Sequence, residues 1–417
     1  MKKTIIIIGG GFAGVELAKG LAESDYHVVL VDKQNHHQFQ PLFYQVASAR
    51  LEPSDISFPF RKIFQRSKNI TFRMAEVKEI LPAEKKIITS SGELSYDYMV
   101  MATGCRTNFF GNSQIARHTF SMKSTQEAIT IRNEILLSFE RYITATADEQ
   151  TALMNIVIVG AGPTGVELSG AFAEMRKYVL PKDYPHIDFS KLDIILLEGS
   201  KHTLNSMSEP AKLASRRYLE QLGVTIRTET FVTEYDGTKL ILNSGEQLKS
   251  KNVIWAAGVV GNVLKGLDEK ESVVKSRFVV DRYNRLKNHS TIFAIGDVAH
   301  MITPKYPQGH PQLANVAIHQ GKNLARNFLA LNKGKALKEY EYRDLGSMAT
   351  VGKYRGVVDL PWLKFHGVLA WLTWMFLHLM LILGVRNRLI VFINWAWNFF
   401  TKDTSLRLIF KTDKLNP

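Results

Sequence analysis

The same glycine spacing occurs twice in this chain, each time directly after a run of branched apolar residues. The first copy, Gly9-x-Gly11-x-x-Gly14, follows the four isoleucines of residues 5–8 and precedes the apolar-periodic residues 15–22. The isoleucine run predicts a strand buried on both faces, as in a parallel sheet, and the periodic run predicts a helix. A glycine loop between such a strand and helix is typical of a nucleotide site, because N–H groups at the helix N-terminus can face phosphates.

Each glycine of this loop has an expected role in binding a dinucleotide. Gly9 permits the tight turn, Gly11 lets the backbone approach a pyrophosphate, and Gly14 lets the helix pack closely on the strand. A second predicted strand, residues 28–31, ends at Asp32, which lies 23 residues after Gly9 (32 − 9) and can hold a ribose hydroxyl. Together the strand, loop, helix and acid predict a nucleotide site rather than a plain glycine turn.

The second copy of the spacing, Gly160-x-Gly162-x-x-Gly165, follows the apolar residues 155–159 and again opens a predicted helix. Two nucleotide folds in one chain argue against an isolated binding module. Two nucleotides that face each other are what electron transfer within one protein needs. We therefore expect an α/β protein with two Rossmann-like dinucleotide-binding domains.

Glu198 is the expected acid of the second fold. It lies 38 residues after Gly160 (198 − 160), and an insertion over residues 178–191 accounts for the longer offset. A carboxylate there can accept hydrogen bonds from both ribose hydroxyls of NAD and would repel a 2′-phosphate, and no arginine directly follows it. The sequence therefore predicts NADH rather than NADPH at this site.

Three further predicted strands end in small residues, which allow a backbone to lie against a ligand. Two of them run into Ala102-Thr103-Gly104 and Ala256-Ala257-Gly258, and the third runs into Gly296-Asp297. A strand that delivers Gly–Asp at its carboxyl end can direct the carboxylate at a ribityl chain. The alternative role for Asp297 is that of a simple helix N-cap.

Two other segments have alternative interpretations. Residues 34–47 either pack under a flat cofactor ring or form a satellite hydrophobic cluster. His36 and His37 in this segment lack spaced partner ligands, so we expect them at the surface or in a turn. Residues 312–321 predict the start of a helix, whose polar groups either bond substrate carbonyl oxygens or form a solvated face.

Composition limits the function further. The chain has 417 residues and a net charge of +14. Such an excess of bases suits nucleic acid or an anionic membrane, but no nucleic-acid-binding pattern is present, so we expect no nucleic-acid partner. Cys105 is the only cysteine, which excludes an internal disulfide and a dithiol redox pair. We also expect no metal, because His, Cys and Glu show no ligand spacing.

The C-terminal residues 367–385 contain His378 as their only ionisable side chain, and this run of 19 residues is long enough to span a bilayer. Two membrane interpretations compete, namely a transmembrane helix and a monotopic helical platform with its apolar face in the lipid. A helix buried in the protein core is the third alternative. The membrane interpretations are supported by the bases that follow the run, Arg386, Arg388, Lys402 and Arg407.

Taken together, these motifs resemble those of type II NADH:quinone oxidoreductases, which are single-chain, non-pumping respiratory flavoproteins. The resemblance covers nearly the whole chain and rests on both fingerprints, the Ala102-Thr103-Gly104 and Ala256-Ala257-Gly258 strand ends, the Gly296-Asp297 pair and the apolar tail. It implies that the first fingerprint binds FAD and the second binds NADH. The implied reaction is hydride transfer from NADH to FAD, followed by transfer of two electrons to a membrane quinone without proton pumping.

The resemblance also implies the residues that contact each nucleotide. Contacts to FAD are expected from Gly9, Gly11, Phe12, Ala13, Gly14, Asp32, Lys33, Pro41, Leu42, Val77, Ala102, Thr103, Gly104, Gly296, Asp297 and Ala314. Contacts to NADH are expected from Gly160, Gly162, Pro163, Thr164, Gly165, Glu198, Ala257 and Gly258.

Glu167, Asn315 and His319 are expected to be catalytic. Glu167 matches a family glutamate beside the contact of flavin and nicotinamide. The segment from Ala314 to Gln320 matches a quinone-site motif that usually contains two glutamines, and Asn315 and His319 occupy their positions here. The expected quinone contacts are Asn315, Ile318, His319 and Gln320. His319 or water would supply protons, because imidazole titrates near neutral pH.

The implied organisation is an FAD-binding domain of residues 1–120 and 270–345, an inserted NADH-binding domain of residues 121–269, and a helical membrane-association region of residues 346–417. The enzyme would lie on the cytoplasmic face of the inner (plasma) membrane, monotopic or with one transmembrane helix, and a homodimer is an option.

One alternative function is a reductase of a small protein such as ferredoxin, which the tail argues against. A sulfide:quinone oxidoreductase would need a second cysteine, and a NAD-sensing flavoprotein would turn over slowly.

Overall fold

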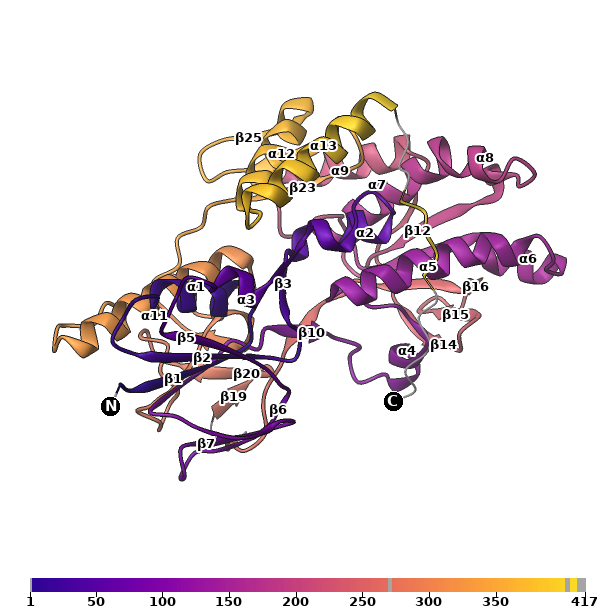
Figure 1. Cartoon of the computed structure of the whole chain (residues 1–417). Helices are drawn as coiled ribbons and strands as arrows, with labels where there is room; N and C mark the ends of the chain where they lie inside the picture. The colour runs from indigo at the N-terminus through magenta and orange to yellow at the C-terminus, as the bar shows by residue number, and fades with distance from the viewer. Residues whose placement is uncertain (1, 269–271, 402–405, 411–417) are drawn as a thin grey trace. The chain divides into compact units, whose positions relative to one another are not determined.

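The computed structural model describes residues 2–268, 272–401 and 406–410 (Figure 1). The chain divides into two compact units, and each unit is assembled from three stretches of sequence. Unit 1 comprises Met1–Gln38, Phe58–Arg106 and Val259–Asp344, and unit 2 comprises Phe39–Ser57, Thr107–Gly258 and Leu345–Pro417. The first glycine loop therefore lies in unit 1 and the second lies in unit 2.

Unit 1 is built on a five-stranded sheet with the order β21-β9-β1-β2-β5, in which all strands are parallel. The four isoleucines of β1 are no more than 4% exposed, because β1 is the central strand. This is the burial on both faces that the apolar run predicted. The strands of this sheet are β1 (Thr4–Ile8), β2 (His27–Asp32), β5 (Ile70–Met74), β9 (Tyr98–Met101) and β21 (Ile292–Ala294).

Two helices of unit 1 lie side by side (Figure 1). The first, α1 (Phe12–Gly20), connects β1 to β2, and the second is α11 (Ala314–Asn332). The turn at Gly296 lies against both of them, since a Cβ on Gly296 would sit 3.2 Å from Ala13 and 3.4 Å from Ala317. The packing of α1 on α11 thus brings the first glycine loop, the Gly–Asp turn and the 314–320 segment into one region of unit 1.

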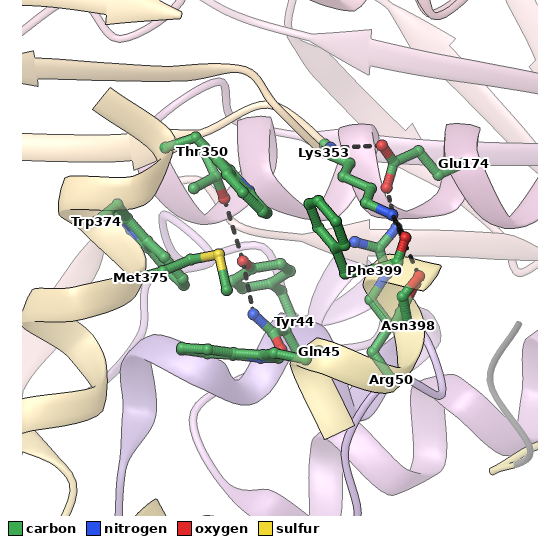
Figure 2. A pocket seen from close by; sticks show the side chains of 13 residues that line it. Tyr44, Gln45, Arg50, Glu174, Thr350, Lys353, Trp374, Met375, Asn398 and Phe399 are labelled. Atoms are coloured by element: carbon green, nitrogen blue, oxygen red, sulfur yellow. Dashed lines mark hydrogen bonds and ion pairs between the residues drawn. The ribbon is translucent and has the colours of Figure 1, made fainter. Parts of the chain in front are cut away.

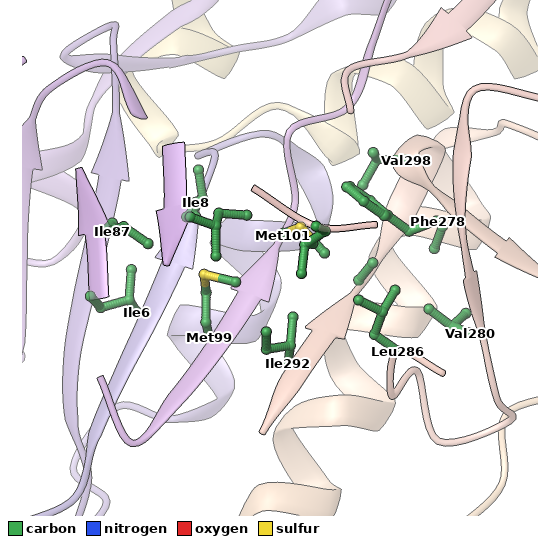
Figure 3. Packing of buried hydrophobic residues seen from close by; sticks show 14 of the residues in the cluster. Ile6, Ile8, Ile87, Met99, Met101, Phe278, Val280, Leu286, Ile292 and Val298 are labelled. Carbon is green, nitrogen blue, oxygen red and sulfur yellow. The ribbon is translucent and has the colours of Figure 1, made fainter. Parts of the chain in front are cut away.

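The hydrophobic core of unit 1 joins the parallel sheet to a second sheet (Figure 3). Met99 and Ile292 from the first sheet and Phe278 from the second are at most 1% exposed. Burial of a side chain of this size contributes roughly 1.5–3 kcal/mol, so this contact is a main source of stability for the unit. The second sheet consists of β19 (Val273–Val274), β20 (Arg277–Val280) and β22 (Ala299–Met301).

Unit 2 is built on a four-stranded parallel sheet with the order β13-β12-β11-β17. Helix α7 (Pro163–Tyr178) connects β11 to β12, and α9 (Glu209–Gln221) connects β12 to β13. Both central sheets are thus parallel with helical crossovers, which confirms the predicted α/β class. The strands are β11 (Asn155–Val159), β12 (Asp193–Leu197), β13 (Thr225–Arg227) and β17 (Asn252–Trp255).

The long offset between Gly160 and Glu198 has two structural sources. Helix α7 has 16 residues where α1 has 9, and the insertion over residues 178–191 contains α8 (Leu180–Asp183) and the short helix η3 (Phe189–Lys191). The sequence analysis predicted the insertion and missed the longer helix.

Each unit also contains a three-stranded antiparallel sheet between the third and fourth strands of its parallel repeat. The two antiparallel sheets share a register shift at the same place, between Val77 and Glu79 in unit 1 and between Val232 and Glu234 in unit 2. The internal duplication therefore extends well beyond the glycine loops. These strands are β6 (Val77–Leu81), β7 (Lys86–Thr89) and β8 (Gly92–Ser95) in unit 1, and β14 (Val232–Tyr235), β15 (Lys239–Leu242) and β16 (Gln247–Lys249) in unit 2.

The C-terminal part of unit 2 has no counterpart in the repeat. It contains an antiparallel sheet of β23 (Ser347–Thr350), β24 (Gly356–Asp359) and β25 (Lys364–Gly367). Two helices follow, α12 (Val368–Leu381) and α13 (Val385–Thr401), drawn in yellow tones in Figure 1. The apolar run 367–385 is therefore divided at residues 382–384. Within the described ranges, we find no helix with both the length and the apolar character needed to cross a bilayer.

The remaining elements are short, apart from α5. Helix α5 begins after Ser124, whose Oγ accepts a hydrogen bond of 3.1 Å from Glu127 N and caps the helix. Residues 143–146 separate α5 from the shorter helix α6. The other helices that the structure describes are α2 (Phe43–Ala47), η2 (Pro53–Asp55), α3 (Phe60–Ile63), α4 (Ser113–His118), α5 (Thr125–Tyr142) and α6 (Ala147–Leu153). The other strands are β3 (His36–Gln38), β4 (Ser57–Pro59), β10 (Cys105–Thr107) and β18 (Val259–Gly261).

Candidate functional site

The first glycine loop has the close contacts that a dinucleotide fold requires. Gly9 has φ +105°, and a Cβ on it would lie 2.3 Å from the carbonyl oxygen of Ala102. A Cβ on Gly14 would lie 1.9 Å from the carbonyl oxygen of Gly9, so only glycine lets α1 begin this close to β1. A Cβ on Gly11 would meet nothing within 4 Å, which leaves the loop open for a pyrophosphate.

Asp32 shapes this loop from the end of β2. Its Oδ2 accepts a hydrogen bond of 2.6 Å from Gly10 N, and its Oδ1 accepts one of 2.8 Å from Gln34 N. Burial raises the pKa of Asp32, and these two hydrogen bonds oppose that rise. The acid expected to bind a ribose hydroxyl thus also fixes the backbone of the glycine loop and of the turn after β2.

His37 is a part of this loop that the sequence analysis placed wrongly. It is 3% exposed, its Nδ1 donates to the carbonyl oxygen of Gly10 at 2.9 Å, and its ring packs edge-on against Phe12. Burial lowers the pKa of His37 to about 4, so the ring is neutral at physiological pH. The sequence analysis expected His37 at the surface or in a turn, and no spacing in the sequence indicates this support role.

The backbone of the turn η4 (Gly296–Val298), which carries Asp297, is held by hydrogen bonds to three side chains. Gly296 N donates to Gln320 Oε1 at 2.7 Å, and Gln312 Nε2 donates to the carbonyl oxygen of Asp297 at 3.0 Å. Arg277 donates to the carbonyl oxygen of Ala299 at the end of the turn. The residue at the helix N-cap is Ile295, so the alternative role of Asp297 as an N-cap is wrong.

One of these supports is itself buried and polar, and a further residue contacts the Asp297 side chain. Gln320 is 1% exposed, and its Nε2 has no hydrogen-bond partner among the residues that the structure describes. Cys105, the single cysteine, donates from Sγ to Asp297 Oδ2 at 3.0 Å. Cys105 therefore positions the carboxylate of Asp297 and Gln312 positions its backbone, as a group that must meet a cofactor at a fixed position requires.

The quinone-motif residues begin helix α11. Ala314 is exposed, Asn315, Ile318 and His319 are partly exposed, and Gln320 is buried against the Gly296 turn. Burial lowers the pKa of His319, and the positive charges of Lys322 and Arg326 lower it further. The imidazole of His319 is therefore mostly neutral at physiological pH.

The other residues expected to contact FAD are distributed as follows. Thr103 is fixed after β9, because its Oγ1 donates to the carbonyl oxygen of Asn262 at 2.6 Å and Asn262 Nδ2 donates back to its carbonyl oxygen at 3.0 Å. Pro41 and Leu42 form part of the short helix η1 (Gln40–Leu42) and belong to unit 2. The remaining expected FAD residues all belong to unit 1, including the exposed Lys33, the partly exposed Val77, and Ala102 and Gly104.

The second glycine loop reproduces the first within unit 2. Gly160 has φ +101°, and a Cβ on Gly165 would lie 1.9 Å from the carbonyl oxygen of Gly160. Glu198 Oε2 accepts from Ala161 N at 2.6 Å, and its Oε1 accepts from Ser200 N at 2.8 Å. The structure thus brings together the residues expected to contact NADH, since Gly162, Pro163 and Thr164 open α7 and Ala257 packs against Gly160, with Gly258 next to it.

Glu167 lies one turn into α7 and is buried, with 8% of its surface exposed. Its Oε1 accepts from Thr350 N at 3.3 Å, and it also interacts with the side chain of Trp374. Burial raises the pKa of Glu167 to about 8 despite these two contacts. Most of the Glu167 side chains therefore hold a proton at pH 7.

A pocket of unit 2 lies next to this acid (Figure 2). Tyr44 hydroxyl and Thr350 Oγ1 are 3.1 Å apart, and Gln45 Nε2 donates to the same hydroxyl at 3.0 Å. Figure 2 shows Trp374 and Met375 on one side and the charged Glu174, Arg50 and Lys353 on the other. The pocket therefore has an aromatic half and a charged half. Its other lining residues are Gly352, Trp371, Trp395, Asn398 and Phe399.

No group of His, Cys, Asp and Glu side chains suited to a metal ion occurs in the part of the chain that the structure describes. The residues of the first loop do fit FAD, because the acid, the open face at Gly11 and the fixed carboxylate of Asp297 all belong to unit 1. Those of the second loop fit a dinucleotide on the same grounds.

Comparisons with known proteins agree with this geometry. Residues 3–321 match the family model of pyridine nucleotide-disulphide oxidoreductases, and residues 345–402 match that of the NDH2 C-terminal domain. The chain is 31% identical to the type II NADH:quinone oxidoreductase Ndh of Mycobacterium tuberculosis, over 95% of this chain and 88% of that protein. It is 28% identical to the type II NADH:quinone oxidoreductase of Staphylococcus aureus, over 85% of this chain and 89% of that protein.

The fold agrees as well. The solved structure of NDH2 from Plasmodium falciparum in complex with NADH has a TM-score of 0.89, with 20% identity over 99% of this chain and 100% of that chain. The predicted family and the two predicted nucleotides, FAD and NADH, are therefore confirmed. The chain belongs to the type II NADH:quinone oxidoreductases, flavoproteins that transfer electrons from NADH through FAD to a quinone.

Proposed function

We propose that Glu167 donates a proton to the quinone from beside the aromatic pocket of unit 2, in an enzyme that lies on a membrane through α12 and α13. The observation that carries this proposal is the buried, protonated carboxyl of Glu167, which contacts two residues of the pocket lining, Thr350 and Trp374. FAD, when bound, supplies the redox chemistry by accepting a hydride from NADH and releasing two electrons.

The chemistry of quinone reduction needs an acid of this kind. Reduction of a quinone to a quinol takes up two protons with the two electrons, and a general acid works best when its pKa is near the working pH. Glu167 meets this requirement, with a pKa of about 8. The aromatic half of the pocket, with Tyr44, Trp374 and Trp395, offers flat surfaces against which a quinone ring can pack.

His319 is the second candidate for the proton donor, and Asn315, Ile318 and Gln320 remain proposed quinone contacts on the family resemblance. Because the pKa of His319 is lowered and that of Glu167 is raised, a smaller fraction of His319 carries a proton at neutral pH. The observation in favour of His319 is its partial exposure at the start of α11, in the same region of unit 1 as the Gly296 turn. His319→Ala should then slow quinone reduction while reduction of the flavin by NADH stays fast.

A stopped-flow experiment on Glu167→Gln tests the proposal. The amide keeps the shape and the hydrogen bond from Thr350 but cannot release a proton at neutral pH. Flavin reduction by NADH should stay within a few-fold of wild type, and flavin reoxidation by a soluble quinone should slow about a hundredfold. Equal losses in both half-reactions, or fast reoxidation, would remove Glu167 from this role, and Glu16→Gln serves as the matched control.

The membrane attachment is proposed on the surface of α12 and α13. Their large apolar side chains are exposed, with Phe376 at 67% and Phe400 at 81%, whereas a helix of the protein core would bury them. Bases Arg386 and Arg388 lie at the start of α13, where they can meet anionic headgroups. The other exposed apolar residues are Val368, Leu369, Leu372, Leu377, Met380, Leu381, Val385, Leu389, Phe392, Ile393, Trp397 and Phe399.

The finer assignments are part of the same proposal. The expected residues of the first loop hold FAD and those of the second hold NADH, in domains of residues 1–120 with 270–345 and residues 121–269, and residues 346–417 associate with the membrane. The cytoplasmic face of the inner membrane is proposed because NADH is a cytoplasmic metabolite. Protease protection in inverted membrane vesicles tests the face, and light scattering in detergent tests the homodimer.

A further inference from the structure

A second cavity of unit 2 adjoins the aromatic pocket and has no role in the proposed reaction. Its volume is about 110 Å³, whereas a single water needs roughly 10–15 Å³. It shares the side chains of Arg50, Glu174, Lys353 and Asn398 with the aromatic pocket. Six further residues line this cavity but not the aromatic pocket, namely Ser48, Met175, Tyr178, Val179, Tyr354 and Arg355.

The ionised side chains that line this cavity are three cations and one carboxylate. Glu174 is already fully engaged, because Arg50 lies 2.6 Å from its Oε2 and Lys353 N donates to its Oε1. Lys353 Nζ donates to the carbonyl oxygens of Asn398 and Phe399 in the last turn of α13. Among the residues that the structure describes, Arg355 has no carboxylate within ion-pair distance. The described side chains that line the cavity therefore include more cations than carboxylates.

The rim of the cavity is aromatic and amphipathic. Tyr354 is 39% exposed, and its ring lies 5.3 Å from that of Trp371 on α12 and 5.6 Å from that of Phe399 on α13. Lys353 Nζ lies 5.1 Å from the Tyr354 ring centre. Tyrosine, tryptophan and lysine together at the edge of an exposed apolar surface are typical of the headgroup level of a membrane.

From this arrangement we infer that the cavity binds the phosphate of an anionic phospholipid headgroup. Arg355, Lys353 and the Tyr354 rim supply the positive charge and the amphipathic edge, and the exposed apolar faces of α12 and α13 accommodate the acyl chains. The inference depends on the proposed membrane attachment, and it adds a specific lipid class and a specific pocket to it.

Arg355→Gln is the sharpest variant, because Arg355 lines this cavity and not the aromatic pocket. Arg117→Gln is the matched control, since Arg117 is an exposed arginine of α4 outside both cavities. Arg355→Lys keeps the charge without the planar guanidinium and should fall between the two. Bound FAD absorbance and thermal melting establish that each variant is folded.

The full chain with bound FAD is kept in neutral detergent and incubated with short-chain phosphatidylglycerol, phosphatidylcholine or inorganic phosphate. Bound ligand is then measured by native mass spectrometry. Wild type and Arg117→Gln should retain phosphatidylglycerol in preference to phosphatidylcholine. Arg355→Gln should bind phosphatidylglycerol about fivefold more weakly. Equal retention by Arg355→Gln, equal binding of both lipids, or saturation by inorganic phosphate alone would overturn the lipid assignment.

A separate measurement distinguishes this inference from the proposed membrane attachment. Wild-type protein is sedimented with vesicles of phosphatidylcholine alone and of phosphatidylcholine with phosphatidylglycerol. Failure to bind either vesicle would contradict the membrane attachment, while the retention measurement in detergent still reports on the cavity. Binding to both vesicles with equal loss for Arg355→Gln and Arg117→Gln would show that diffuse charge, and not this cavity, accounts for the attraction to anionic lipid.

Discussion

The two nucleotide-binding units have the same four residues near the start of the helix that follows each glycine loop, but they place the shared acid in opposite surroundings. Gly14-Val15-Glu16-Leu17 lies in α1, and Gly165-Val166-Glu167-Leu168 lies at the matching place in α7. Glu16 is partly exposed, 3.0 Å from Lys19 and 3.7 Å from Lys322. Glu167 is buried, and burial raises its pKa to about 8. The local sequence fixes where the carboxyl lies, and the packing around it decides its charge.

The packing partner of each helix explains the difference. In unit 1, α1 packs on α11, which brings Lys322 to Glu16. In unit 2, α7 packs on β23, whose Thr350 N reaches Glu167, and α12 contributes Trp374. The C-terminal segments therefore bury the acid of unit 2 and raise its pKa, whereas the acid of unit 1 stays at the helix surface. The following experiments test that contrast.

The largest effects are expected from alanine at the third glycine of each loop. In Gly14→Ala and Gly165→Ala the new Cβ would lie 1.9 Å from a backbone oxygen, so each should cost at least about 3 kcal/mol. Gly14→Ala should lose FAD, whereas Gly165→Ala should keep FAD and lose NADH binding. Flavin absorbance and NADH titration measure both. Loss of the same nucleotide in both variants would contradict the assignment of one nucleotide to each loop.

The pH dependence of stability should distinguish the two glutamates. The ordinary pKa of Glu is near 4.5, and that of Glu167 is about 8, so the folded state holds a proton that the unfolded chain has released between these values. The free energy of unfolding should therefore fall as pH rises from 4.5 towards 8, by up to about 1.4 kcal/mol per pH unit. This contribution is complete below pH 4.5 and is lost as pH rises through 8.

Urea unfolding at saturating FAD, repeated across this pH range, measures the slope. Glu167→Gln should remove it, because the amide does not titrate. Glu16→Gln should leave it as in wild type. A slope that survives in Glu167→Gln would assign the proton to another group.

Glu198→Gln should change the choice of nucleotide. The charge that repels a 2′-phosphate is lost, while an oxygen acceptor for Ala161 N remains. The ratio of kcat/KM for NADH to that for NADPH should fall about tenfold. Asp32→Asn is the matched change in unit 1, and it should weaken FAD binding without affecting this ratio. An unchanged ratio in Glu198→Gln would remove Glu198 from specificity.

The smallest effect is expected from Glu16→Gln. Its two lysine contacts are partly exposed ion pairs, which contribute at most about 1 kcal/mol. The thermal midpoint and both half-reactions should therefore stay close to wild type. A loss of quinone reduction comparable to that of Glu167→Gln would mean that position in the repeat, and not burial, gives the glutamate its role.

The sequence was enough to predict the repeated fold because its signals are local. Four isoleucines before Gly9 and the apolar run before Gly160 each predict a strand. Only glycine fits near the start of each following helix, because an added Cβ would lie 1.9 Å from a backbone oxygen. The same argument predicted the strand into Gly296 and the helix that begins near residue 314.

The chemistry of the site was less predictable, because it depends on contacts between distant residues. His37 bonds Gly10 across the loop, and Thr350 lies 183 positions from Glu167 in the sequence. The division of the apolar tail into α12 and α13 at residues 382–384 was missed for a different reason, since hydropathy does not show where a run bends. The repeated register shift at Val77 and Val232 also has no signal in a single sequence.

The strands of the unit 2 sheet lie in the sequence between β9 and β21 of the unit 1 sheet, and this order has a consequence for biosynthesis. All four parallel strands of unit 2 are complete once the ribosome has passed Trp255, but the edge strand β21 and the Asp297 turn of unit 1 follow about forty residues later. We expect the parallel sheet of unit 2 to form before that of unit 1, because the N-terminal strands of unit 1 cannot pair with β21 until it has been synthesised. FAD binding is then a late step of folding. Cells short of FAD should accumulate chains in which unit 1 is incompletely folded and sensitive to proteolysis.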